Sequence, residues 1–384
     1  MSRPVDPVPG VSPFRIEVPE ADLADLRRRL LATRWPDELP GVGWDWGVAR
    51  EYLRDLVGYW SDGYDWRRHE QRLNALPQFT TVIDGQRLHF LHVRSGQPDA
   101  HVLMLLHGWP GTPADFLPLI DVLDGAFHLV VPSLPGFGFA GPTTTPGWDP
   151  PRIARVLQAL MHRLGYDHYG VQGGDFGSVV AADIGRTDPR RVSGIHLNAL
   201  ATASMPVSEE QLQALTPLER DRVAANQAWW RTHNGYATQM GTRPQTLAYA
   251  LTDSPAGQLA WYLEWFVGHD PETTKQSPVE PDAILTDTSI LWFTNTAGSA
   301  ARLYREAAGS FGTPQRISGV PTAVANFRED RAVRGLAAQA HRLVRWTDID
   351  VGGHFAALQA PRELATDIRE FFGSLGPFGS CSPS

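Results

Sequence analysis

One aspartate stands in a turn where the chain could expose a nucleophile. Residues 173–177 read Gly-Gly-Asp-Phe-Gly, between an apolar stretch and an alanine-rich stretch. Glycines allow a tight strand-to-helix turn without Cβ clashes, and such a turn pushes its central side chain clear of a sheet. Because that central residue is Asp175, we expect its carboxylate to attack an electrophile and form an ester. A Gly-rich turn with a solvated aspartate is the alternative that the short motif alone leaves open.

A histidine and a pair of acids near the C-terminus could complete this chemistry. His354 lies in a Gly-Gly-His-Phe loop after the last predicted strand, and residues 327–330, Phe-Arg-Glu-Asp, follow the strand before it. Hydrolysis of an ester needs a base that activates water and an acid that orients the base. A lone histidine is more often structural. The nucleophile, acid and histidine at three strand ends, in this chain order, favour a catalytic role for His354.

The elements that must position these residues alternate between strands and helices. This spacing predicts βαβ units and a parallel sheet, whose ligand sites lie at the carboxyl ends of the strands. With the order of the three site residues, it predicts an α/β-hydrolase fold, a mostly parallel sheet flanked by helices. The predicted strands are 14–18, 79–83, 88–93, 102–106, 127–131, 168–171, 193–197, 321–327 and 343–346, and helices are predicted at 151–164 and 361–372.

Tryptophans mark two segments outside the expected core. Trp35, Trp46, Trp60 and Trp66 lie in an N-terminal meander, and five more lie in a long helical insertion after residue 200. Large aromatic side chains mostly bury area, so we expect them to pack against the core. The predicted division is 1–75 for the N-terminal meander, 76–200 and 316–376 for the hydrolase core, 201–315 for an inserted helical lid, and 377–384 for a flexible tail.

The composition excludes several classes of protein. The 384 residues carry a net charge of -8, with 20% charged and 42% hydrophobic residues, so the chain is globular and offers no basic patch for nucleic acid. The single cysteine, Cys381, excludes a disulfide framework and a cysteine metal site. No stretch reaches the roughly 18 apolar residues of a membrane span, and the N-terminus lacks a signal-type apolar region. We expect a soluble, cytoplasmic protein with no membrane partner.

Five stretches together resemble the microsomal-type epoxide hydrolases. They are Phe-Arg-Ile-Glu-Val-Pro at 14–19, the tryptophan-rich meander, His-Gly-Trp-Pro at 107–110, Gly-Gly-Asp-Phe-Gly at 173–177, and Gly-Gly-His-Phe-Ala-Ala at 352–357. The resemblance extends from about Phe14 to Phe372 and includes the family's N-terminal domain. It implies a soluble bacterial member, without the membrane anchor of the mammalian enzymes, that converts an epoxide to a vicinal diol through an ester on Asp175.

The resemblance implies further site residues in the lid. In this family two lid tyrosines hold the epoxide oxygen, and the matching positions are Tyr236 and Tyr304. Tyr249 and Tyr262 lie in helical stretches, where we expect core packing instead. The implied partners are a small epoxide and water, with no cofactor and no metal, and a homodimer is left open.

The acid and the oxyanion donors also follow from the resemblance. Asp330 matches the acid that orients His354, and Glu329 is the alternative because the family's usual Phe-Pro-x-acid pattern has Arg in place of Pro here. The backbone N–H groups of Trp109 and Phe176 match the oxyanion hole that stabilises a tetrahedral intermediate. The side chains of Trp109 and Phe176 are expected to line the substrate site.

Two other functions compete with this interpretation. A haloalkane dehalogenase shares the aspartate and the histidine, but it commonly has Trp beside the nucleophile to donate to halide, and Phe176 has no donor. A non-catalytic binding protein of the same fold is the second alternative, since fold alone does not establish activity. The presence of every catalytic group argues against it. The tryptophan-rich lid favours an apolar or aromatic epoxide, in bacterial secondary metabolism or in detoxification.

Overall fold

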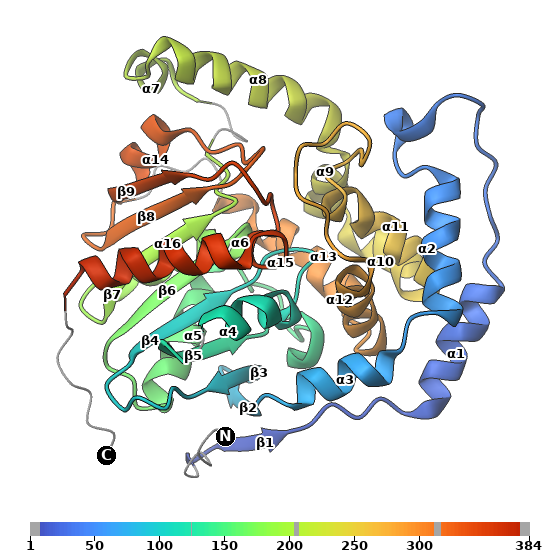
Figure 1. Ribbon diagram of the computed structural model, residues 1–384, viewed down its shortest axis with the longest axis horizontal. Helices are drawn as coiled ribbons and strands as arrows, with labels where there is room; N and C mark the ends of the chain where they lie inside the picture. Colours follow the sequence, from blue (N-terminus) through green and yellow to red (C-terminus); the bar gives the residue numbers. More distant parts are fainter. Residues whose placement is uncertain (1–7, 124, 203–206, 311–315, 377–384) are drawn as a thin grey trace.

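The computed structural model describes residues 8–123, 125–202, 207–310 and 316–376, so the predicted tail at 377–384 lies outside the described residues. Among these residues, nine strands form one sheet in the order β1-β2-β3-β5-β4-β6-β7-β8-β9 (Figure 1). The first three strands pair antiparallel, as does β3 with β5, and the remaining pairs are parallel. The mostly parallel sheet is therefore confirmed. The strands are β1 (Val11–Phe14), β2 (Gln78–Ile83), β3 (Gln86–Val93), β4 (His101–Leu106), β5 (Phe127–Pro132), β6 (Tyr169–Gly174), β7 (Val192–Asn198), β8 (Pro321–Asn326) and β9 (Arg342–Asp348).

Both faces of the sheet are buried because its central strands are apolar throughout. Leu103 and Leu105 of β4 point into one core, and Met104 and Leu106 point into the other, as the two-residue period of a strand requires. Each fully buried side chain of this size contributes about 1.5–3 kcal/mol by leaving water. The first core is covered by α4 (Leu117–Leu123) and α16 (Pro361–Ser374), and the second by α5 (Pro150–Arg163) and α6 (Phe176–Thr187).

Several helices are inserted between β7 and β8, in the segment that the sequence analysis assigns to a lid, and we call them the lid helices. Capping side chains and prolines start most of them; Thr216, for example, accepts from the backbone of Glu219 in a capping box. None of the helices in the described residues combines the length and apolar character needed to cross a bilayer. The lid helices are α7 (Glu209–Gln213), α8 (Pro217–His233), α9 (Gly235–Thr242), α10 (Pro244–Asp253), α11 (Pro255–Phe266), α12 (Pro281–Phe293) and α13 (Ala297–Glu306).

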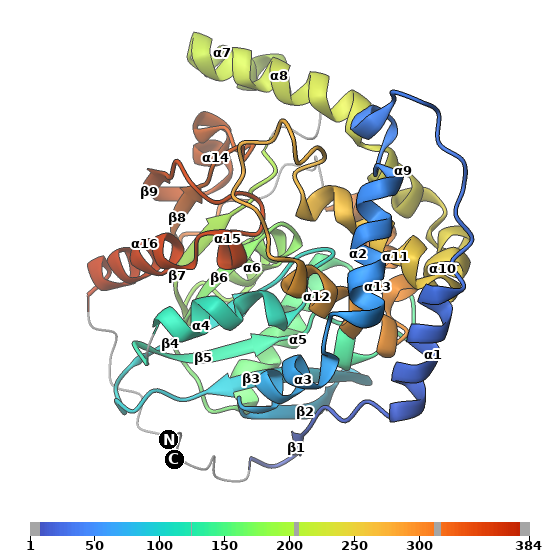
Figure 2. The same ribbon diagram turned by 45° about the vertical axis from the view of Figure 1, so that its right-hand side comes forward.

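The N-terminal helices pack on the outside of the lid (Figure 2). Trp60 is buried and its Nε1 donates to Ser289 Oγ at 3.1 Å, while the hydroxyls of Tyr64 and Thr286 lie 3.0 Å apart. These contacts agree with the packing role expected for Trp60, and Trp66 is buried as well. The same expectation is wrong for Trp46, whose side chain is 75% exposed. The domain bounds stay a prediction. The N-terminal helices are α1 (Glu20–Leu31), α2 (Arg50–Asp62) and α3 (Trp66–Asn74).

The strand predicted at 14–18 is wrong, because β1 ends at Phe14. Ile16 and Val18 are buried and alternate as they would in a strand, but their backbone N–H groups bond to side chains of α3. The N–H of Ile16 donates to Asn74 Oδ1 at 2.9 Å, and that of Val18 to Glu70 Oε1 at 2.8 Å. An extended segment can thus satisfy its backbone without a neighbouring strand.

Candidate active site

Asp175 occupies a strained turn between β6 and α6. Its backbone has φ 52 and ψ -126, a conformation that residues with a side chain rarely adopt. The glycines on either side of Asp175 are required because other backbone atoms approach them closely. A Cβ on Gly173 would lie 2.3 Å from the carbonyl oxygen of Gly177, and one on Gly177 would lie 2.2 Å from that of Leu106. The predicted strand-to-helix turn is therefore present, with Asp175 at its apex, and the role of Asp175 as nucleophile stays a prediction.

One oxygen of the Asp175 carboxylate is held by the loop that follows β4. The backbone N–H of Trp109 donates to Asp175 Oδ1 at 3.0 Å. A Cβ on Gly108 would lie 2.5 Å from Asp175 Cβ, so only glycine permits this approach. Phe176 follows Asp175 in the chain as the first residue of α6. The role of both backbone N–H groups as oxyanion donors stays a prediction.

His354 lies on the side of the second oxygen. Its Nε2 is 3.8 Å from Asp175 Oδ2, and its ring packs against Trp265 with centroids 4.5 Å apart. The backbone N–H of His354 donates to Gln276 Oε1 at 3.3 Å, which ties the histidine loop to the segment before α12. Burial lowers the pKa of His354, although the charge of Asp175 opposes this. The imidazole is therefore neutral at neutral pH and can accept a proton.

Both candidate acids lie at the wall of the same cavity, in different surroundings. Asp330 is buried, and its Oδ2 accepts from the backbone N–H groups of Ala199 at 3.2 Å and Phe327 at 3.1 Å. Burial raises the pKa of Asp330 to about 7. Glu329 is exposed and its Oε2 accepts from Thr274 Oγ1 at 2.7 Å. In the described part of the chain, no hydrogen bond or ion pair joins either acid to His354, so the relay role stays a prediction.

The two predicted lid tyrosines meet opposite Asp175. Tyr236 of α9 and Tyr304 of α13 have ring centroids 5.7 Å apart, and both pack against the buried ring of Trp109. Burial, together with the negative charge of Asp175, raises the pKa of both phenols well above the ordinary range. Both hydroxyls therefore stay protonated at neutral pH and can donate.

The two competing tyrosines behave differently from each other. Tyr262 is fully buried, as expected, with its ring edge against Trp109 at 5.5 Å. Tyr249 was expected in the core, but it is 71% exposed on α10. The prediction for Tyr249 was wrong because helical spacing alone does not determine which face of α10 packs against the lid interior.

These groups surround a cavity of about 380 Å³ that is large enough for a small organic molecule. Asp175, His354, Tyr236 and Tyr304 are among its polar groups, together with the two candidate acids. Trp109 is absent from the wall, because its ring stacks behind Tyr236, whereas Phe176 is present as predicted. Among the described residues, no group of three or more His, Cys, Asp or Glu side chains could hold a metal ion. The apolar part of the wall includes Phe176, Val179, Leu200, Trp229, Trp230 and Trp265.

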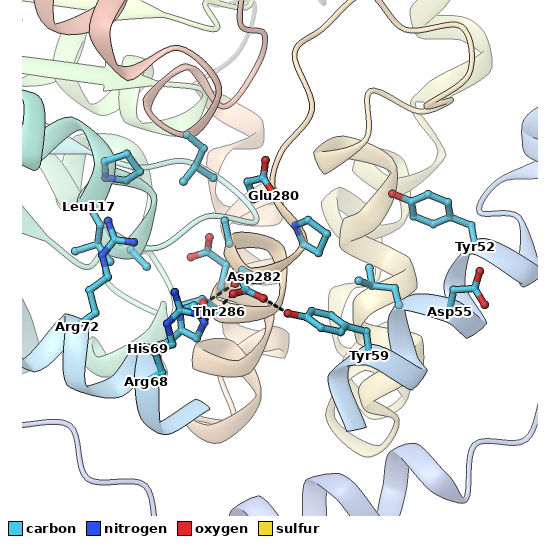
Figure 3. A pocket seen from close by; sticks show the side chains of 17 residues that line it. Tyr52, Asp55, Tyr59, Arg68, His69, Arg72, Leu117, Glu280, Asp282 and Thr286 are labelled. Atoms are coloured by element: carbon cyan, nitrogen blue, oxygen red, sulfur yellow. Dashed lines mark hydrogen bonds and ion pairs between the residues drawn. The ribbon is translucent and has the colours of Figure 1, made fainter. Parts of the chain in front are cut away.

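A larger cavity, of about 760 Å³, lies between the N-terminal helices and α12, and we call it the outer cavity (Figure 3). There Asp282 accepts from the hydroxyl of Tyr59 at 2.6 Å and lies 3.3 Å from His69 Nε2. The outer cavity contains neither Asp175 nor His354. Size alone therefore does not identify the reactive site, and the smaller cavity holds the groups that can do chemistry.

The fold and this site together define an α/β hydrolase with an aspartate at the nucleophile position. Comparison with known proteins agrees: residues 101–361 match the family model described as alpha/beta hydrolase fold, and residues 11–116 match the one described as epoxide hydrolase N terminus. The chain belongs to the microsomal-type epoxide hydrolases.

Individual relatives support this membership along nearly the whole chain. A Stigmatella aurantiaca protein named "Putative epoxide hydrolase" is 41% identical, over 95% of this chain and 86% of its own. The juvenile hormone epoxide hydrolase of Manduca sexta is 31% identical, over 96% of this chain and 87% of its own. The solved structure of Aspergillus niger epoxide hydrolase superposes with a TM-score of 0.85 at 32% identity and covers 95% of this chain and 96% of its own.

Substitution of the two acids will show which one orients His354. Asp330→Asn should lower kcat by up to about 10⁴-fold, as removal of the acid does in other triads, whereas Glu329→Gln should have little effect. The asparagine oxygen can still accept from Ala199 and Phe327, so the fold should hold. Steady-state kinetics with styrene oxide provide the measurement, and the opposite order of effects would assign the role to Glu329.

The same variant has a second, pH-dependent signature. A carboxyl whose pKa is about 7 when folded and about 3.9 when unfolded stabilises the fold fully at low pH and loses that contribution as the pH rises to 7. The melting temperature of Asp330→Asn should therefore improve relative to the parent chain between pH 4 and pH 8.

Proposed function

We propose that this enzyme converts an apolar or aromatic epoxide to a vicinal diol through an ester on Asp175. The observation that carries the proposal is the placement of the Asp175 carboxylate. One oxygen binds the N–H of Trp109, the other lies toward a neutral His354, and two protonated tyrosines line the same cavity.

The first step is alkylation of the enzyme. Asp175 Oδ2 attacks a ring carbon of the epoxide, and the bond from that carbon to the ring oxygen breaks. An alkoxide is a poor leaving group at neutral pH, so the oxygen needs donors as its charge develops. Tyr236 and Tyr304 supply those hydroxyls, and one of them transfers its proton to the oxygen. The product is a hydroxyalkyl ester of Asp175.

The second step is hydrolysis of that ester. His354 takes a proton from water while the water oxygen bonds to Cγ of Asp175. The charge of the tetrahedral intermediate falls on Oδ1, which the N–H groups of Trp109 and Phe176 stabilise. The bond between Cγ and Oδ2 then breaks, and the diol leaves with Oδ2 and a proton from His354. The second proton of the water, left on the restored Asp175 carboxyl, returns to the tyrosine that lost its own in the first step. Asp330 orients the imidazole and favours its charged form.

The wall of the cavity supports an apolar or aromatic substrate. Trp229, Trp230 and Trp265 present rings on the lid side, and the guanidinium of Arg331 lies 3.6 Å from the ring centroid of Trp229, which fixes that ring. We further propose that the enzyme acts in the cytoplasm, in bacterial secondary metabolism or in detoxification.

A two-substrate assay tests the function directly. Styrene oxide should give its diol, and a chloroalkane should release no chloride, because Phe176 has no side-chain donor for halide. Chloride release without diol formation would favour a dehalogenase, and binding of styrene oxide without turnover would favour a non-catalytic protein.

Loss of a tyrosine hydroxyl should slow alkylation specifically. Tyr236→Phe and Tyr304→Phe each keep the ring, so each should lower the rate of ester formation by about 10²-fold or more, the usual contribution of a positioned acid. The double variant should be slower than either, because one hydroxyl can partly replace the other. Stopped-flow tryptophan fluorescence with styrene oxide measures the rate.

Two other tyrosines serve as controls. Tyr262 is buried beside Trp109 and Tyr249 is exposed, so Tyr262→Phe and Tyr249→Phe should leave alkylation nearly unchanged. If a control slows ester formation while both site variants do not, the donors to the epoxide oxygen have been misplaced.

A further inference from the structure

A second, small cavity borders Asp175 and His354 and lies apart from the two tyrosines. Its volume is about 40 Å³, enough for about one water molecule. Neither Tyr236 nor Tyr304 lines it, so it is distinct from the substrate cavity. We call it the inner cavity. Its wall comes from the ends of β4 and β6, the loop at 107–116, and the histidine loop with α15 (Ala356–Gln359).

Asp115 is a buried carboxyl at this wall that the mechanism above does not use. Its Oδ1 has no hydrogen-bond partner in the described part of the chain, and the same is true of Oε1 of Gln172, a second residue of the wall. A Cβ on Gly111 would lie 2.0 Å from Asp115 Oδ2, so the carboxyl occupies space that only glycine leaves free. Buried acceptors without partners are rare in native proteins, and a bound water commonly satisfies them.

Asp115 is held by a second buried carboxyl, that of Asp287 on α12. The two carboxyls hydrogen-bond to each other, and Thr112 Oγ1 donates to Asp287 Oδ1 at 2.5 Å. Two adjacent buried carboxyls cannot both ionise. Burial and the charge of Asp287 raise the pKa of Asp115 well above its usual range, and burial raises that of Asp287 to about 6. At neutral pH, Asp115 is therefore protonated and donates its proton in a hydrogen bond to Asp287. Its Oδ1 can then accept a hydrogen bond from another group.

We propose that Asp115 positions the water that hydrolyses the ester. Water in the inner cavity donates one hydrogen to Asp115 Oδ1 and the other to His354 Nε2, which turns an oxygen lone pair toward Cγ of Asp175. The inference rests on the proposed ester mechanism. The water proton passes to His354, the water oxygen bonds to Cγ, and Asp115 keeps its own proton throughout. Asp115 thus acts through orientation, to which attack on a carbonyl is sensitive.

Separate rates for the two steps test this role. With styrene oxide in stopped-flow and quenched-flow experiments, Asp115→Ala should slow ester hydrolysis by about 10- to 100-fold, the range for a lost hydrogen bond to the reacting water. Alkylation should keep its rate, so the ester accumulates and kcat and KM fall together. Asp115→Asn should restore most of the rate, because its amide donates to Asp287 and its oxygen still accepts.

Two further variants sharpen the comparison. Gly111→Ala displaces Asp115 Oδ2 without removing any hydrogen-bonding group, so it should show the same selective loss even if Asp115→Ala does not fold. Asp282→Asn removes a carboxylate from the same helix as Asp287, at the wall of the outer cavity, and Asp282 does not line the inner cavity, so both steps should be unchanged.

The outcomes distinguish the possible failures. If Asp115→Ala slows alkylation as much as hydrolysis, or if Asp115→Asn is as slow as Asp115→Ala, the carboxyl pair is only a structural clamp between the loop and the lid. Ester decay at the parental rate in Asp115→Ala also overturns the proposal. If no ester is found in the parent chain or in His354→Gln, the ester mechanism itself has failed, which is a separate result.

Discussion

Asp175→Ala should abolish diol formation, lowering kcat by about 10⁴- to 10⁶-fold, as loss of the nucleophile does in other covalent enzymes. The turn offers no substitute. Ser178, one turn along α6, donates its hydroxyl to the carbonyl oxygen of Asp175 at 2.6 Å and is buried there. Product analysis with styrene oxide provides the measurement, and residual activity near that of the parent chain would remove Asp175 from the reaction.

A glycine at the same position separates lost chemistry from a lost fold. Asp175 has φ 52, so Asp175→Gly should relieve backbone strain of about 1 kcal/mol or more. We therefore expect the glycine variant to melt no lower than the parent chain and to be inactive. If this variant were inactive only because it unfolds, its melting temperature would fall instead.

Isotopic labelling tests the ester step without any substitution. In a single turnover in ¹⁸O-water, the heavy oxygen should appear in Asp175, and the diol should be unlabelled, because water attacks Cγ and not the substrate carbon. Mass spectrometry of the peptide that contains Asp175 detects the label. Labelled diol in the first turnover would favour direct attack by water.

His354→Gln should trap the ester and reduce steady turnover by about 10⁶-fold, the loss seen when another enzyme's catalytic histidine is removed. Alkylation needs no base, because the attacking group is a carboxylate, but hydrolysis needs one to take a proton from water. The intact mass of the variant should rise by that of one substrate. Alkylation without turnover would also appear as a burst of consumed epoxide equal to the enzyme present.

A matched control lies in the same aromatic surroundings. His269 is near Trp265, and burial lowers its pKa to about 3, so it is neutral as well. His269→Gln should leave no lasting adduct. His269 lines the same cavity and packs against Trp265, but the histidine 3.8 Å from the Asp175 carboxylate is His354. If His354→Gln shows neither adduct nor burst, His354 acts before the ester forms and the assignment fails.

Much of the core could be predicted because local chemistry decides it. The apolar run at 102–106 forms β4 because a strand buried on both faces needs no alternation, and the glycines around Asp175 mark close approaches that no other residue tolerates. Asp175 and His354 follow from those signals and from the chain order of the fold. Because both residues follow strands of the same sheet, their positions at the strand ends predict that they lie close together, and their side chains are 3.8 Å apart.

The wrong predictions concern residues whose burial depends on side chains that are distant in the sequence. His89 and His92 lie in the predicted strand at 88–93, where their polar side chains alone would favour an edge or solvent position. Both are buried, because Ser133 and Gln78 bond the first and Tyr166 bonds the second. The sequence pattern of β3 contains no trace of those partners.

The supporting residues of the site were missed for the same reason. Gln276, which holds the backbone of His354, is 78 residues away in the chain, and Asp287, which holds Asp115, is 172 away. The lid brings both to the core. An acid such as Asp115, four residues beyond a glycine, has no local signal that separates it from a solvated one.

The contact between Trp109 and Asp175 makes the two oxygens of one carboxylate unequal. If Oδ1 stays on the N–H of Trp109, only Oδ2 attacks, and only Oδ2 leaves with the diol. The oxygen that arrives from water then takes the vacated place and becomes the next attacking atom. Each molecule of product therefore carries an oxygen that the solvent supplied one cycle earlier. The enzyme therefore loses one of its own atoms, Oδ2 of Asp175, in every turnover and regains it from water. An oxygen atom from the solvent reaches the product one turnover after it enters the enzyme.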